Sequence, residues 1–280
     1  MALEDDFSDI IKKSRNGQQR SVSDLSRLTG LSEPEIMNLE RGHAPQHRDQ
    51  VIALAKGLGL RPGPLEQIAS GSWRPRAVPV VPGLDIIIGS IGGYEVKGYV
   101  LHNGGDAVII DTGYDPKAML ELLARRGLRL RAICLTHGHA DHAEGIKEIL
   151  AAWPVPVYLG PADLDLLDWT PHSDLLSVPK DGQEIQVGDF TVSFMTTPGH
   201  TPGGICYRVD QSEHPLCFVG DTLFAGSIGR SNPATLYETH LESVRERVLK
   251  LPDEMLLFPG HGPATTVREE SAHNPFGKQT

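Results

Sequence analysis

The chain has 280 residues, of which 39% are hydrophobic and 22% are charged. This length and composition exclude a disordered chain and a fibrous repeat, and they suit one large globular domain or two smaller ones. The net charge of −10 is uneven: residues 1–75 hold ten basic and ten acidic residues, whereas residues 76–280 hold sixteen and twenty-six, which disfavours nucleic-acid binding by the second part.

The chain begins with an acidic stretch, where a secretion signal would be basic and then apolar. No run of about 18 apolar residues follows, so we expect a cytoplasmic protein that does not bind membranes. Cys134, Cys206 and Cys217 are each flanked by apolar residues, which indicates buried strand positions and not a disulfide framework.

Hydrophobic residues of the first 70 positions recur at helical spacing. The pattern predicts five short helices at residues 5–15, 21–29, 32–41, 48–58 and 63–69. The stretch Ser21–Gly42 resembles the helix-turn-helix of the Xre/phage-repressor family, and the later helices continue its five-helix pattern. The resemblance implies a small all-α domain over residues 1–72, in which the helix from Ser32 would contact DNA bases.

The helix that would contact DNA begins with Glu33, Pro34 and Glu35. Two carboxylates there would face a groove walled by phosphates, and Arg41 is the only basic residue of that helix. Ser32 and Glu35 predict a capping box, which stabilises the helix whether or not it binds DNA. DNA is therefore one candidate partner, and the alternatives are protein interaction, dimerisation or a retained fold.

Residues 73–83 are rich in Pro and Gly and predict a linker. In residues 84–280, short apolar stretches alternate with turns, which predicts strands at Leu84–Ile88, Val96–His102, Ala107–Ile110, Ala132–Leu135, Val155–Leu159, Phe190–Met195, Ile205–Val209 and Leu216–Val219. Helices are predicted at Pro116–Arg126, Ala143–Trp153 and Leu241–Leu251. This mix indicates packed sheets flanked by helices, in an α/β or α+β layered domain.

Three histidines and an aspartate lie within six residues directly after a predicted strand, at His137, His139, Asp141 and His142. Three more side chains of these types follow other apolar strands in tight turns, at His200, Asp221 and His261. Loops at strand ends, held by a rigid sheet, are where functional sites are usually built. Seven ligand-type residues in this arrangement predict a metal site.

These seven residues, in this order, resemble the metal signature of metallo-β-lactamase-fold hydrolases over roughly residues 80–280. The resemblance implies an αββα sandwich with a two-metal site at one edge. It further implies a first metal bound by His137, His139 and His200, a second bound by Asp141, His142 and His261, and a bridge formed by Asp221. Asp111 matches a position that steadies the metal ligands by hydrogen bonding.

Imidazole and carboxylate ligands without thiolate suit zinc, iron or manganese, and we expect two divalent ions, with zinc preferred. Two such ions would lower the pKa of a bridging water from about 15.7 to about 7 and so supply a hydroxide. The predicted catalytic carboxylates are Asp221, which by resemblance bridges the metals, and Asp141, which would manage the proton of the attacking water. A thiolate, whose thiol pKa is about 8.5, leaves with little help from an acid, so the predicted reaction is thioester hydrolysis.

Zinc β-lactamases generally carry a cysteine where this chain has Asp221, so antibiotic hydrolysis is not expected. The stretches Thr197–Gly204, Gly220–Arg230 and Asn274–Phe276 are most similar to the compact glyoxalase II group, which hydrolyses S-acylglutathione thioesters. Arg230 matches a basic contact to glutathione in that group. The two residues after it depart from the Thr-Asp common there, which leaves the identity of the thiol open.

Three alternatives are compatible with the same signature. A persulfide dioxygenase would use a single iron, held by resemblance on His137, His200 and Asp221. A lactonase would hydrolyse a cyclic ester with the same two metals. In the third alternative the metal domain is a ligand sensor attached to a transcriptional regulator.

Overall fold

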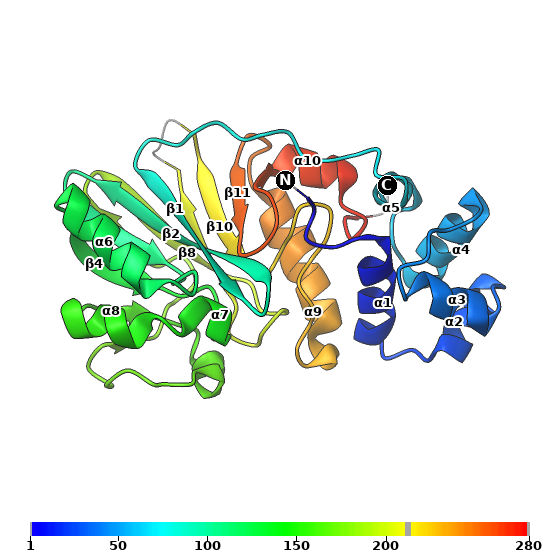
Figure 1. Cartoon of the computed structure of the whole chain (residues 1–280), viewed down its shortest axis with the longest axis horizontal. Helices are drawn as coiled ribbons and strands as arrows, with labels where there is room; N and C mark the ends of the chain where they lie inside the picture. The colour runs from blue at the N-terminus through cyan, green and yellow to red at the C-terminus, as the bar shows by residue number, and fades with distance from the viewer. Residues whose placement is uncertain (1, 211–213, 279–280) are drawn as a thin grey trace.

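A computed structural model describes residues 2–210 and 214–278 of the chain. Five helices precede a sandwich of two sheets, as predicted (Figure 1). The helices are α1 (Phe7–Gly17), α2 (Val22–Thr29), α3 (Glu33–Leu39), α4 (Arg48–Leu58) and α5 (Pro62–Ala69). Their bounds lie within two residues of the predicted ones.

Three of these helices begin at a capping box. Asp6, Ser21 and Ser32 each accept a backbone N–H from the first turn, and the acidic residue three positions later accepts the cap's own N–H. The box predicted at the start of α3 is therefore confirmed: the Ser32 N–H donates to the Glu35 carboxylate at 2.9 Å. Glu35 is thus engaged in starting the helix.

The first sheet has the strand order β1-β2-β3-β4-β5-β6. Its strands are β1 (Leu84–Ile91), β2 (Tyr94–Asn103), β3 (Asp106–Ile110), β4 (Arg129–Cys134), β5 (Val157–Tyr158) and β6 (Leu176–Ser177). The first three strands are antiparallel, and β3 to β6 run parallel to one another. The carboxyl ends of β3 and β4 therefore meet at the same edge of the sheet.

The second sheet has the order β12-β11-β10-β9-β8-β7. Its strands are β7 (Glu184–Val187), β8 (Phe190–Thr196), β9 (Ile205–Val209), β10 (Leu216–Gly220), β11 (Leu256–Pro259) and β12 (Thr265–Thr266). All neighbours are antiparallel except β10 and β11, which are parallel. Both sheets are thus mixed, and the predicted α/β sandwich fold is confirmed.

The helices of the sandwich differ from the prediction in three places. Helix α6 (Pro116–Arg126) has the predicted bounds, but α7 (Ala140–Ala143) and α8 (Ile146–Ala152) replace a single predicted helix. Gly145 separates them and packs closely against Thr112. The helix predicted at Leu241–Leu251 is α9 (Tyr237–Glu242), which continues as a π turn and a 3₁₀ turn. Helix α10 (Val267–His273) was not predicted, because it lacks a repeating apolar face.

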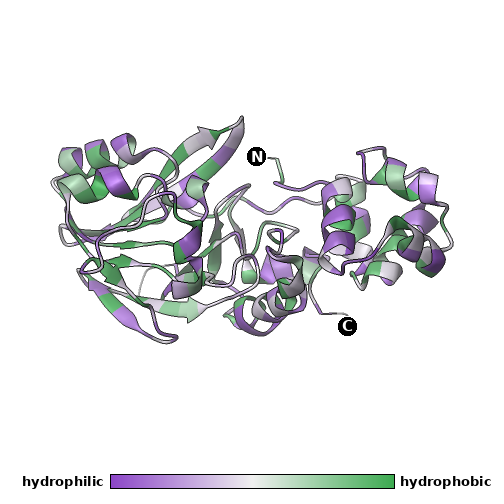
Figure 2. Cartoon of the chain, turned by 90° about the horizontal axis from the view of Figure 1, so that it is seen from below, coloured by the Kyte–Doolittle hydropathy of each residue, from purple (hydrophilic) through white to green (hydrophobic). Residues whose placement is uncertain are grey.

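The sandwich has one hydrophobic cluster between its sheets, rich in aromatic rings such as Tyr99 and Phe218, and another under α6 and α8. Its three cysteines are buried and unpaired, as expected. Figure 2 shows that the hydrophobic residues are concentrated in the strands. Among the described residues, no helix is both long and apolar enough to span a bilayer.

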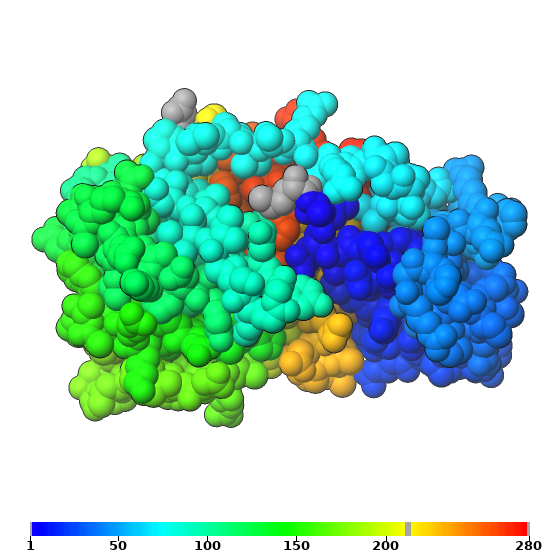
Figure 3. Space-filling model, viewed as in Figure 1, coloured from blue at the N-terminus to red at the C-terminus, as the bar shows by residue number. Residues whose placement is uncertain are grey.

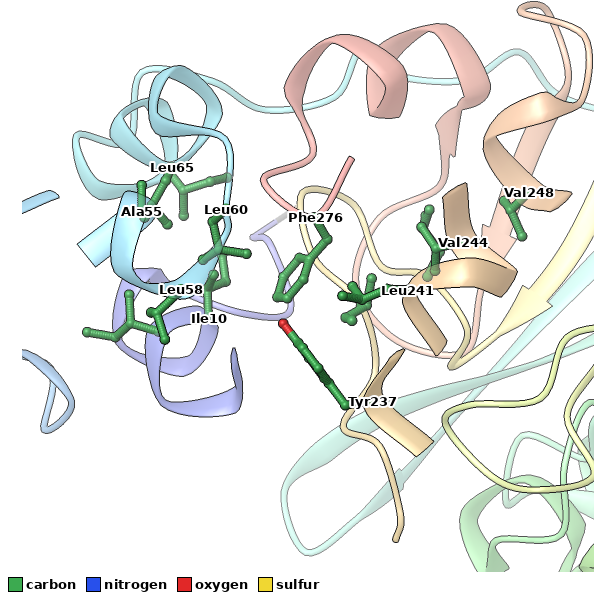
Figure 4. Close-up of a cluster of buried hydrophobic side chains, with 14 of the residues drawn as sticks. Ile10, Ala55, Leu58, Leu60, Leu65, Tyr237, Leu241, Val244, Val248 and Phe276 are labelled. Atoms are coloured by element: carbon green, nitrogen blue, oxygen red, sulfur yellow. The ribbon is translucent and has the colours of Figure 1, made fainter. Parts of the chain in front are cut away.

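The third hydrophobic cluster runs from the N-terminal helices into the sandwich. Ile10 of α1 and Leu60 after α4 belong to it together with Tyr237 and Leu241 of α9 and the C-terminal Phe276, and Figure 4 shows the Phe276 ring between the two groups. Helices α9 and α10 lie between the sheets and the five helices (Figure 1). The helical segment therefore shares a core with the sandwich.

Contacts of Arg61 and Trp73 with the C-terminal residues reinforce this packing. The Trp73 indole stacks on His273 of α10 with ring centroids 5.0 Å apart, and its Nε1 donates to Glu269 at 3.1 Å. The Arg61 backbone N–H donates to the Pro275 carbonyl at 2.8 Å. These three contacts join Arg61 and Trp73 to the last 20 residues of the chain.

Candidate metal centre

The seven histidine and aspartate side chains singled out in the sequence lie together at one edge of the sandwich. Four follow β4, and the other three follow β8, β10 and β11, so the ends of four strands supply the whole set. Ligand-type atoms lie within 4.8 Å of one another in three overlapping groups: His137, His139 and His200; His137, Asp141 and His142; and His142, Asp221 and His261.

Asp221 occupies the middle of this cluster. One carboxylate oxygen lies 3.4 Å from His142 Nε2, and the other lies 3.6 Å from His200 Nε2 and 3.7 Å from His261 Nε2. Asp141 lies beside His261, with 3.2 Å between its carboxylate and Nε2. Asp221 therefore contacts histidines of both predicted metal positions.

Four of the five histidine rings are oriented by contacts on their Nδ1 atoms, which leaves Nε2 directed into the cluster, whereas His139 Nδ1 itself lies 3.0 Å from His200 Nε2. His200 Nδ1 lies 2.7 Å from the Arg230 carbonyl, and His261 Nδ1 lies 2.6 Å from the Glu95 carbonyl. His142 Nδ1 lies 2.8 Å from the Asp111 carboxylate. Such outer contacts fix the tautomer and raise the basicity of a metal-ligating histidine.

The buried Asp111 follows β3 and has a positive φ of 52°. Besides its contact with His142, its carboxylate accepts hydrogen bonds from the backbone N–H and the hydroxyl of Thr136, each at 2.7 Å. Thr136 precedes His137, whose Nδ1 lies 3.0 Å from the Thr136 hydroxyl. Asp111 thus connects the His142 ring to Thr136, the residue before His137.

Buried atoms without hydrogen-bond partners show whether the cluster fits bound cations. His137 Nε2, His142 Nε2 and Asp221 Oδ1 are buried and have no hydrogen-bond partner among the described residues. Buried polar atoms are nearly always paired, because an unpaired one costs about 1–3 kcal/mol. Imidazole nitrogens and carboxylate oxygens are good donors to zinc, iron and manganese. The donor set therefore fits divalent metal ions.

Burial and neighbouring charges separate the pKa values of these histidines. Burial lowers the pKa of His200 to about 4 and holds that of His137 well below its usual range. Burial also acts against the charged form of His261, but the carboxylates of Asp221 and Asp141 raise its pKa to about 9. The carboxylates of Asp221 and Asp141 therefore favour the protonated, positively charged form of His261.

Glycines allow the loops to approach each other closely here. A Cβ atom on Gly260 would lie 2.5 Å from Asp221 Oδ1 and 2.3 Å from His142 Cε1. A Cβ atom on Gly229 would lie 2.8 Å from His200 Nδ1. A larger residue at either position would displace a ligand-type side chain.

Two buried residues near the site were not predicted. Asp163 accepts hydrogen bonds from the Gly138 N–H (3.2 Å), the Thr201 hydroxyl (2.6 Å) and the Gly203 N–H (2.7 Å), so it joins the two loops that carry the first histidine group. His240 of α9 lies 2.8 Å from the Thr222 carbonyl, next to Asp221. Asp163 follows β5 and the Gly160-Pro161 turn, so it fits the strand-end pattern and was overlooked in the sequence. His240 lies within a helix, where that pattern does not apply.

The metal centre opens into a cavity of about 550 Å³. Arg230 lines this cavity with His139, His200, Asp221 and His261, and its side chain is exposed. The sequence predicted Arg230 as a substrate contact, and its position beside the centre is compatible with that role. The opposite wall comes from the N-terminal segment.

Two facing mixed sheets, with histidine and aspartate side chains gathered at one edge, define a metal-binding sandwich. Residues 91–261 of the chain match the Metallo-beta-lactamase superfamily. The match covers more than half of the chain, which therefore belongs to this superfamily. The five helices precede the matched residues.

Similar proteins are known by sequence and by structure. The probable metallo-hydrolase YqgX of Bacillus subtilis is 32% identical over 200 residues, which are 66% of this chain and 94% of that protein. The hydroxyacylglutathione hydrolase GloC of Haemophilus influenzae is 30% identical over 186 residues, 61% of this chain and 87% of that protein.

Among solved structures, the BLEG-1 B3 metallo-beta-lactamase has 33% sequence identity and a TM-score of 0.61, and the match covers 69% of this chain and 98% of that one. The protein TTHA1623 in a di-iron-bound form has 31% identity and a TM-score of 0.59, over 68% of this chain and 99% of that one.

Proposed function

We propose that the chain is a two-metal hydrolase that cleaves a thioester of the S-acylglutathione type. The observation that carries this proposal is the position of Asp221, whose two carboxylate oxygens lie near histidines of both groups. A carboxylate so placed suits two cations that share one ligand. The site residues, the second metal and the choice of zinc all belong to this proposal.

Two divalent cations bound here would acidify a shared water and polarise the carbonyl of the substrate. The chain itself supplies the residues that hold the ligand side chains in position and a carboxylate that takes up a proton. Asp141 has 25% of its side chain exposed, whereas Asp221 has 10%. Asp141 is thus the more accessible carboxylate, and we assign to it the proton of the attacking water. Asp111 and the carbonyls behind His200 and His261 keep the rings in place.

The thioester assignment has chemical and comparative support. A thiolate leaves without a strong general acid, because the pKa of a thiol is about 8.5. The exposed guanidinium of Arg230 lines the cavity, where it suits a carboxylate of the thiol part of the substrate. The similarity to GloC, which is described as a hydroxyacylglutathione hydrolase, supports the same thiol.

Persulfide dioxygenase activity is the second candidate. His137 and His200 belong to one group of donors, and Asp221 lies 3.6 Å from His200, so these three residues suit a single iron. The similarity to a structure with bound iron supports iron as an alternative metal. Metal stoichiometry and oxygen uptake distinguish this candidate from the hydrolase.

The hydrolase is tested by following thiol release from S-lactoylglutathione with purified, zinc-loaded protein. We expect saturable hydrolysis that a chelator abolishes, and a loss of at least about 100-fold in kcat/KM for His200→Ala. The matched control His172→Ala removes an exposed histidine and should retain full activity. Hydrolysis of lactones but not thioesters, or of neither, by protein that holds its metal would refute the proposal.

A further inference from the structure

The cavity at the metal centre has a wall that does not come from the sandwich. The sandwich supplies His139, His200, His261 and the loop around Asp221 and Arg230. The other lining residues precede or belong to α1: Glu4, Asp5, Asp9, Lys12, Lys13 and Asn16. The N-terminal helix is therefore part of the candidate site.

A buried lysine holds this wall against the loop that carries Asp221 and Arg230. Lys13 Nζ donates to the Ile228 carbonyl at 2.5 Å, pairs with the Asp5 carboxylate and lies 5.4 Å from the centre of the Phe224 ring. Only 8% of the Lys13 side chain is exposed. Because Phe224 and Ile228 lie between Asp221 and Arg230, the position of α1 is fixed relative to both.

The residues before α1 close the same side of the cavity. Gly262, which follows His261, packs on Glu4: a Cβ atom there would lie 3.1 Å from the Glu4 backbone nitrogen. Figure 3 shows the start of the chain seated against the C-terminal segments. The wall is thus packed in place, and it adjoins a ligand-type histidine.

Two positively charged side chains that line this cavity have no partner among the described residues. Lys12 and Arg230 are exposed, and no side-chain hydrogen bond or ion pair involves their charged groups in residues 2–210 and 214–278. Of the acids in the same wall, Asp5 pairs with Lys13, and the Asp9 carboxylate accepts the Asp6 N–H at 3.2 Å, whereas Glu4 lies beside the loop of His261 and Gly262. Lys12 is therefore the positive group that α1 itself leaves available to a ligand in the cavity.

Spacing along α1 adds a second polar group. Lys12 and Asn16 are four residues apart, so they lie on the same helix face, which also carries Asp9 and Lys13. All four line the cavity. The face offers an ammonium and an amide to a cavity that the Arg230 guanidinium also lines, and these groups suit a carboxylate.

We propose that the N-terminal helical segment is a substrate-binding wall of the enzyme, in which Lys12 and Asn16 act with Arg230 to bind the carboxylates of an anionic thioester. The inference rests on the proposed thioester hydrolysis and adds a site on a part of the chain that precedes the superfamily match. It gives the five helices a role at the metal centre that requires no DNA.

The test compares the full-length, zinc-loaded protein with Lys12→Ala and Lys12→Glu on two substrates. S-lactoylglutathione carries carboxylates, and S-acetyl-N-acetylcysteamine is a neutral thioester. For the anionic substrate we expect KM to rise roughly tenfold in Lys12→Ala and further in Lys12→Glu, with kcat nearly unchanged. For the neutral substrate neither variant should change KM. Lys56→Ala, which removes an exposed lysine of α4 outside the cavity, is the matched control.

Equilibrium titration with glutathione gives the same comparison without turnover. We expect Lys12→Glu to weaken glutathione binding by the same factor as it raises KM. Equal changes for the charged and neutral substrates, or none, would overturn the inference while leaving the hydrolase intact. If the unaltered protein hydrolyses neither thioester, the proposed function is refuted instead. The glutathione titration then tests the inference by itself.

Discussion

Asp163 lies outside the metal cluster, yet its carboxylate contacts both loops that carry the first histidine group. It is fully buried, so its three hydrogen bonds hold the Gly138 and Thr201–Gly203 backbones at a fixed separation. Gly138 lies between His137 and His139, and Thr201 follows His200. The positions of these three histidines therefore depend on the hydrogen bonds that Asp163 makes to their neighbours in the chain.

Removal of this carboxylate should weaken metal binding. In Asp163→Ala, two backbone N–H groups and a hydroxyl lose their buried acceptor, and the two loops lose their connection. We expect zinc affinity to fall about 10–100-fold, measured by competition with a chromophoric chelator. Asp165→Ala, an exposed position in the same 3₁₀ helix, is the control and should bind zinc normally. Equal affinities in the two variants would contradict this role.

The site residues could be predicted from the sequence where they follow one local rule, which is a position directly after an apolar strand. Each of the seven ligand-type residues follows an apolar strand, either in the loop after it or, for Asp141 and His142, in the short helix α7. Strand ends therefore pointed to these seven, and the family resemblance added Asp111. Asp163 and His240 act through contacts made only in the folded chain. Lys12 lies over 120 positions before the first of the seven and reaches the cavity only because α1 packs on the sandwich.

At the scale of elements, the junction between α1 and α9 is tightly packed. Gly17 ends α1, and a Cβ atom there would lie 2.3 Å from Cδ2 of the Tyr237 ring. Tyr237 is buried in the cluster shared by the helical segment and the sandwich, as Figure 4 shows. Gly17 is therefore required by the contact between two elements and not by its own backbone angles.

Gly17→Ala should lower the free energy of unfolding by about 1–3 kcal/mol, because the added methyl group must displace the Tyr237 ring or move α1. Gly63→Ala is the matched control, since Gly63 lies in α5 with no atom within 4 Å of the added methyl. The control should be unchanged or up to about 1 kcal/mol more stable. Urea denaturation measures both, and a similar effect in the two variants would contradict the proposed packing.

Periodicity predicted the elements well where a run of residues had one apolar face. The five N-terminal helices and α6 have such faces, and their bounds were close to those observed. Strands β6 and β12, of two residues each, are too short to show such a face, and β7 shows only Ile185 and Val187 on its apolar face. Contacts with distant residues also break regular helices, as at Gly145 between α7 and α8.

For the molecule as a whole, the sequence indicated a helical part, a linker and a sandwich, but not how they pack. The change from helical to strand spacing near residue 73 is local, whereas the shared cluster joins Ile10 and Leu60 to Tyr237 and Phe276 across the chain. The sequence alone therefore left the helices as a candidate DNA reader. The structure directs α1 to the cavity of the metal centre.

Two metal ions acting together distinguish the proposed thioester hydrolase from an iron-dependent dioxygenase. Metal analysis of the purified protein, with parallel assays of S-lactoylglutathione hydrolysis and of oxygen uptake with glutathione persulfide, separates the two activities. We expect two divalent ions per chain, thioester hydrolysis that depends on them, and no oxygen uptake. One iron per chain, with oxygen consumed and no thioester cleaved, would contradict this expectation.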